Sequence, residues 1–68
     1  MSMTPAEFDA TVKAVSERGK DPAFQARLTP MVDVIRQSYP EGPQQTMAVG
    51  IAGMTLHLDD VAAGRYPA

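Results

Sequence analysis

The sequence predicts an all-α fold, in which a short helix is followed by a helical hairpin. Three observations carry this prediction. Two segments open with a capping residue followed by proline, apolar residues recur at spacings of three and four in each segment, and one breaker separates the last two segments. We expect residues 1–68 to form a single small domain, because 68 residues lie near the lower limit for independent folding.

The first helix is predicted over residues 5–18. The run Thr-Pro-Ala-Glu at 4–7 supplies a hydroxyl at the N-cap, proline at the first helical position and glutamate two positions later, which is a capping box. Gly19 is expected to end the helix in the left-handed conformation. Apolar residues spaced by four and three place one face toward a core: Phe8, Val12 and Val15.

The second helix opens at the Asp-Pro pair 21–22. Pro30 interrupts it, because proline lacks the N–H that would bond to the preceding turn. The segment is therefore either one kinked helix, 22–39, or two helices, 22–28 and 30–39. The apolar stripe stays in phase across the proline, which favours the kinked helix. Its members are Phe24, Leu28, Met31 or Val32, Ile35 and Tyr39.

The third segment follows a breaker, residues 40–45, that contains two prolines and a glycine. Its apolar residues recur at four, three, four and three, which predicts a helix with a heptad-type seam that ends at Gly64. The alternative is an α+β fold in which residues 46–58 form a β-hairpin. The tail, 65–68, is expected to be extended. The seam consists of Met47, Ile51, Met54, Leu58 and Val61.

The core is expected to be thin. Leu, Ile, Val and Phe together supply 13 of the 68 residues, cysteine is absent and there is one histidine. Disulfides are therefore excluded, and neither a zinc site nor any other cofactor is expected. Association with a second copy or with another protein is the remaining way to stabilise so small a core.

Charge and motifs exclude several classes of function. The net charge is −2 and the cations are scattered, whereas proteins that bind DNA normally carry a basic patch. A small DNA-binding regulator is therefore kept only as an alternative. No segment has the length of a membrane span, and the N-terminus does not resemble a signal peptide, so we expect a cytoplasmic protein. No nucleophile motif is present, which predicts that the protein is not an enzyme and has no catalytic residues.

A second face of the third segment carries small residues and His57. This second face is expected either to pack against a partner or to pack against the second helix of the same chain. His57 and Asp60 are interpreted as a solvated helix end or a direct hydrogen bond, and no metal site is expected. Met47 and Met54 are expected to pack in the core, with adaptable partner contacts as the alternative. The candidate interface residues are Met47, Gly50, Gly53, Met54 and His57.

The segment after the second helix is the candidate ligand site. A cation, an aromatic ring, two amides and a hydroxyl lie close in sequence, and the first N–H groups of the third helix would add affinity for an anion. The alternative is that Tyr39 closes the hairpin core and the rest is a solvated turn. The candidate ligand-binding residues are Arg36, Tyr39, Gln44, Gln45 and Thr46.

Tyr39-Pro40 leads into a polar loop, and Thr46-Met47-Ala48-Val49 opens an amphipathic helix. Through these residues, the stretch 35–61 resembles the helical-hairpin domain of phage proteins that sequester cyclic-nucleotide immune signals. The resemblance implies a small homo-oligomeric sponge without catalysis. The later part of the helix, Gly53-Met54-Thr55-Leu56, departs from the aromatic and charged pattern of those proteins.

The sequence thus predicts a small non-enzymatic binding protein, which acts by association as an inhibitor, a sequestering protein or an assembly protein. An anti-defence role is the form that the resemblance implies. The alternatives are a homo-oligomer that binds a cyclic nucleotide or small anion through residues 36–46, and the DNA-binding regulator.

Overall fold

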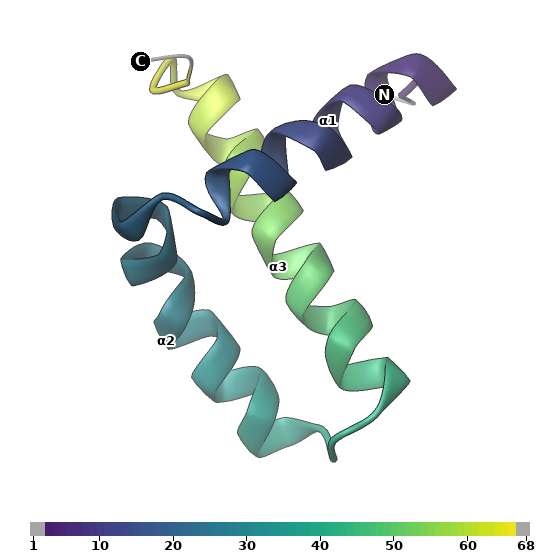
Figure 1. The fold of residues 1–68 in the computed structure, drawn as a ribbon, viewed down its shortest axis with the longest axis vertical. Coiled ribbons are helices and arrows are strands. Elements are labelled where there is room, and N and C mark those ends of the chain that lie inside the picture. The colour runs from purple at the N-terminus through teal and green to yellow at the C-terminus, as the bar shows by residue number, and fades with distance from the viewer. Residues whose placement is uncertain (1–2, 67–68) are drawn as a thin grey trace.

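The computed structural model describes residues 3–66, which form three helices. These are α1 (Pro5–Arg18), α2 (Pro22–Ser38) and α3 (Pro43–Ala62). α2 and α3 form a helical hairpin, and α1 lies across α3 (Figure 1). The described residues contain no strand. The all-α prediction is therefore confirmed, and the β-hairpin alternative for residues 46–58 is wrong.

The first two helices begin where the capping residues predicted. The Thr4 hydroxyl accepts a hydrogen bond from the Glu7 N–H at 3.1 Å, and the Thr4 N–H donates to Glu7 Oε1 at 3.2 Å. This is the reciprocal capping box. Asp21 Oδ1 accepts from the Ala23 N–H at 3.2 Å. Each cap satisfies backbone donors that the first turn of a helix leaves without partners.

The predicted left-handed end of α1 is wrong. Gly19 has φ −59° and ψ −18°, which is right-handed, and its N–H donates to the Val15 carbonyl at 2.9 Å. The chain instead turns directly into α2, because the Asp21 N–H donates to the Arg18 carbonyl at 2.9 Å. Gly64, after α3, does adopt a left-handed φ of 74°.

α2 is one helix through Pro30, so the two-helix alternative is wrong. Pro30 cannot donate a backbone hydrogen bond to the turn before it. At the preceding position the Thr29 hydroxyl donates to the Gln25 carbonyl at 2.8 Å. Packing of α2 on α3 along the hairpin compensates for the missing bond.

The described residues bury few large apolar side chains. Phe24 and Ala52 are the buried hydrophobic residues, while Thr11, His57 and Asp60 are buried although they are polar. The expectation that Met47 packs in the core is wrong, since its side chain is 67% exposed. The other exposed large hydrophobic residues are Met3, Phe8, Val12, Val34, Tyr39, Ile51, Leu58 and Val61.

The helices approach each other closely at the small-residue face of α3. A Cβ atom on Gly53 would lie 3.2 Å from Val15 Cγ1 of α1, whereas a Cβ atom on Gly50 would meet nothing within 4 Å. Gly53 therefore allows α1 to cross α3. Of the two alternatives for this face, a partner or the second helix of the same chain, neither holds at Gly53, where α1 lies.

No helix among residues 3–66 is both long enough and apolar enough to cross a lipid bilayer.

The two glycines of α3 should respond differently to substitution. Gly50→Ala should stabilise the fold by about 0.5–1 kcal/mol, because alanine favours the helix and open space surrounds the new methyl group. Gly53→Leu should destabilise it, because the larger side chain displaces Val15 and α1. Urea unfolding followed by circular dichroism measures both, and equal effects at the two positions would contradict the crossing.

Candidate functional site

The C-terminal end of α3 holds a buried carboxylate that three arginines bind. The Asp60 side chain is fully buried. Arg18 Nη2 donates to its Oδ2 at 2.6 Å, and Arg27 donates to both oxygens, at 2.8 Å and 2.9 Å. Arg65 Nε donates to Oδ1 at 2.9 Å. These four residues, the arginine cluster, join α1, α2 and the segment after α3 to α3 itself.

Aromatic rings pack against Arg18 of the arginine cluster. The Arg18 guanidinium lies 4.4 Å from the centre of the Phe24 ring and 4.8 Å from that of Tyr66. His57 Nδ1 lies 3.1 Å from Arg18 Nη1 and accepts its hydrogen bond, because a guanidinium can only donate. The Tyr66 ring meets His57 edge-on, with ring centres 4.7 Å apart.

This arrangement corrects the interpretation of His57 and Asp60. They form neither a solvated helix end nor a direct pair, because both are buried and Arg18 lies between them. The prediction of an extended tail is also wrong at residues 65 and 66. Their N–H groups donate to the Asp60 carbonyl at 2.8 Å and 3.3 Å, so the chain turns back toward α3. Residues 67–68 of that predicted tail lie outside the described residues.

The contacts in and beside the cluster shift the pKa values of Asp60, Arg27 and His57. Hydrogen bonds from Arg27, then Arg18, hold the pKa of Asp60 far below its usual range. The bond to Asp60 raises the pKa of Arg27. Burial lowers the pKa of His57, and the positive charge of Arg18 lowers it further. His57 is therefore neutral at pH 7.

The polar atoms of the cluster are occupied by bonds within the cluster. Asp60 is saturated by arginines, and no buried side-chain polar atom in the described part of the chain lacks a hydrogen-bond partner. Residues 3–66 contain no group of three His, Cys, Asp or Glu side chains able to hold a metal ion. The geometry is that of a structural cluster, which connects α1, α2 and the segment after α3 to α3.

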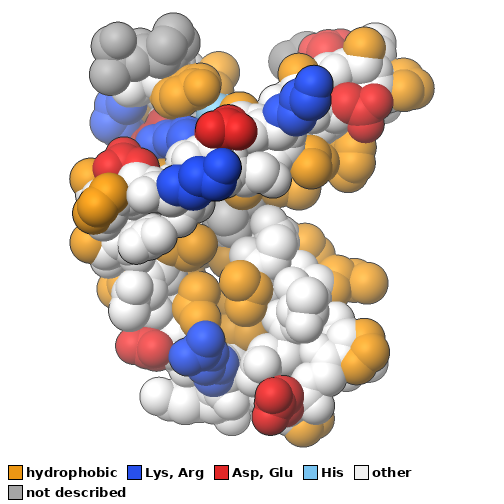
Figure 2. Space-filling view, viewed as in Figure 1, with side chains coloured by type: hydrophobic (Ala, Val, Ile, Leu, Met, Phe, Trp, Pro, Cys, Tyr) orange, Lys and Arg blue, Asp and Glu red, His pale blue; other side chains and the backbone are white. Residues whose placement is uncertain are grey.

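The opposite side of α3 is apolar and exposed. The apolar face of α3 comprises the predicted seam, Met47, Ile51, Met54, Leu58 and Val61. The exposed fractions are 67% at Met47, 58% at Ile51, 39% at Leu58 and 47% at Val61, and Met54 is half-buried. Figure 2 shows hydrophobic side chains projecting from the outer edge of α3 into solvent.

The apolar face points outward because the other side of α3 is already occupied. Its buried residues are Ala52, Gly53, His57 and Asp60. Gly53 lies against α1, and the side chains of His57 and Asp60 both bond to Arg18. From Pro43 to Leu58 the helix carries no Asp, Glu, Lys or Arg. A long apolar surface without charged residues is typical of protein–protein interfaces.

The candidate interface residues from the sequence divide between the two sides of α3. Met47 and Gly50 are exposed, and Met54 is half-buried. Gly53 and His57 are buried inside the chain. The outward part of the set thus lies on or beside the apolar face, and the inward part holds the fold together.

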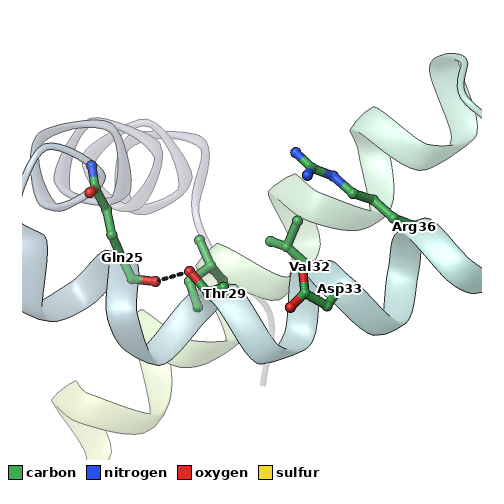
Figure 3. Close-up of a pocket in the computed structure, with 6 residues that line it drawn as sticks. Gln25, Thr29, Val32, Asp33 and Arg36 are labelled. Carbon is green, nitrogen blue, oxygen red and sulfur yellow. Dashed lines mark hydrogen bonds between the residues drawn. The ribbon is translucent and has the colours of Figure 1, made fainter.

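The structure does not bring the five candidate ligand-binding residues into one pocket. Arg36 lines a shallow pocket of about 280 Å³ along α2. Figure 3 shows its labelled neighbours on that helix. Tyr39 and Gln44 line a different pocket, of about 260 Å³, at the start of α3. The residues around Arg36 are Gln25, Leu28, Thr29, Val32 and Asp33.

The remaining two candidates make local backbone contacts. Gln45 Nε2 donates to the Tyr39 carbonyl at 3.2 Å, and the Thr46 hydroxyl donates to the Gly42 carbonyl at 3.3 Å. The first bond links α3 back to the end of α2, and the second lies within the first turn of α3. Tyr39 is 44% exposed, so it does not close the hairpin core as the alternative held.

Comparison with family models, curated proteins and solved structures finds no match to this chain.

Asp60→Asn should destabilise the protein far more than Asp59→Asn. The first change removes the negative charge from three converging arginines, whereas Asp59 is an exposed neighbour. We expect the melting temperature to fall by roughly 10 °C or more for Asp60→Asn and by no more than roughly 3 °C for Asp59→Asn. Similar shifts in thermal denaturation would rule out a structural role for the cluster.

Stability should decline as the pH falls from 7 to 5. The pKa of His57 is lowered in the folded protein, so below about pH 6.5 the unfolded chain binds a proton that the folded chain does not. Denaturant unfolding at each pH measures this loss. His57→Asn should flatten this part of the profile, because His57 is the chain's single histidine. An unchanged slope in the variant would contradict the assignment.

Proposed function

We propose that this protein is a small non-enzymatic binding protein, which acts by docking the apolar face of α3 on another polypeptide. The observation that supports the proposal is the exposure of this uncharged seam, since soluble monomers rarely leave a contiguous apolar strip in water. Inhibition, sequestration and assembly are the roles that suit a binding protein without chemistry of its own.

The residues best suited to catalysis support a binding role rather than an enzymatic one. The single histidine accepts a hydrogen bond from Arg18 and is buried, so it is not placed to act as a general base. The pockets along α2 and at the start of α3 are shallow and open at the surface. A substrate there would not be shielded from water.

The spacing of the face indicates the kind of partner. Side chains at intervals of four and three follow one side of a helix and pack between the side chains of a facing helix. The face runs from Met47 to Val61 of α3, so it extends for about 21 Å. We therefore propose that the partner presents an apolar helix of similar length.

Photo-cross-linking in the cells that make the protein tests this function. A photoreactive phenylalanine analogue at position 51 should give adducts with a polypeptide, because Ile51 lies at the centre of the apolar face. The same analogue at position 34 is the matched control, since Val34 is an exposed apolar residue of α2. No adducts at position 51, or equal adducts at both positions, would overturn the proposal.

A further inference from the structure

We infer that the partner of the apolar face of α3 is the same face of a second copy of this chain, packed antiparallel. The inference rests on the proposed function and names the partner. It follows from the register of the apolar residues, from the charges along α3, and from a pocket at the start of the helix.

The apolar residues are self-complementary about one twofold axis. With the axis passing between positions 52 and 53, Met47 lies opposite Leu58 of the second copy, and Ile51 lies opposite Met54 of the second copy. Within each pair, the next apolar residue along the chain is four positions away on one copy and three positions away on the other. This is the layer pattern of antiparallel helix pairs, and it repeats four times along the interface.

The charges of α3 favour the antiparallel orientation. The first charged residue of the helix is Asp59, and the face before it carries none, so pairing two copies buries no unpaired charge. In the antiparallel register Asp59 lies opposite Thr46 of the second copy, near the first turn of that helix, where the helix dipole is positive. A parallel pair would instead place the two Asp59 carboxylates side by side.

A pocket lies where this register places the end of the second helix. It has a volume of about 260 Å³. Val61 of the second copy falls opposite Gln44, which lines the pocket, so the valine can enter it. Because the pair is twofold symmetric, the same contact forms once at each end of the interface. The lining residues are Tyr39, Gln44, Met47, Ala48 and Ile51.

The rest of the monomer leaves this approach open. α1 reaches α3 at Gly53 and the arginine cluster lies at Asp60, both on the side away from the apolar face. The single chain also leaves large hydrophobic residues exposed along α3. A chain of this length without disulfides commonly gains its missing stability by association.

Light scattering on the purified protein tests the inference. The wild-type chain should have twice the monomer mass of 7.3 kDa at micromolar concentration. Ile51→Lys should weaken the dimer by roughly 100-fold or more, because both copies lose a central apolar contact. Val34→Lys is the matched control and should leave the mass unchanged, because Val34 is exposed on α2.

Cysteine cross-linking tests the register without disturbing the centre of the interface. The chain contains no cysteine. A mixture of Met47→Cys and Leu58→Cys chains should form disulfide-linked dimers upon oxidation, while each variant alone should form few, because positions 47 and 58 meet only across the antiparallel pair. Efficient cross-linking of Met47→Cys alone would indicate a parallel pair and overturn the inference.

The outcomes separate this inference from the proposed function. A wild-type mass of 7.3 kDa at millimolar concentration would overturn the second copy as partner. If position 51 then gave adducts with a different polypeptide in cells, the binding function would stand with another partner. A monomeric mass together with no adducts at position 51 would overturn the proposed function as well.

Discussion

The fold depends on the burial of one carboxylate. Asp60 lies fully inside the molecule and receives hydrogen bonds from Arg18 of α1, Arg27 of α2 and Arg65 beyond α3. A buried charge without partners is very unfavourable, so the helices that carry these arginines must stay close to the polar side of α3. The cluster thus supplies connections that the few buried apolar residues of this short chain do not provide.

The same constraint determines which surface is available for binding. Since Asp60, His57 and Gly53 hold one side of α3 against the rest of the chain, the seam from Met47 to Val61 must face outward. A helix normally buries its most apolar side. α3 instead buries small and polar residues, and most of its apolar side is left exposed. We regard the stability of the monomer and the proposed association as two consequences of this orientation.

Local signals in the sequence predict where the helices lie along the chain, but they do not predict which face of each helix is buried. Thr4 and Asp21 marked helix starts because caps act over three or four residues. The pairing of Arg18 with Asp60 spans 42 positions and has no local signature. The sequence pattern links Asp60 to His57, three positions before it, but contains no signal that links Asp60 to the three arginines. The candidate ligand residues do not share a pocket, because Arg36 in the last turn of α2 lines the pocket along that helix, whereas the Gln45 amide bonds back to the Tyr39 carbonyl.

Nuclear Overhauser contacts in isotope-labelled protein test directly whether α3 turns Gly53 toward α1 and its apolar face outward, and mixed labelling separates contacts within a chain from those between chains. We expect contacts within one chain between the Val15 methyl groups and the Gly53 α-protons, and between the rings of His57 and Tyr66. We expect none from Ile51 to α1 of the same chain. Contacts within one chain that place Ile51 against α1, with those of Gly53 absent, would show that the opposite face of α3 is buried and would rule out this orientation.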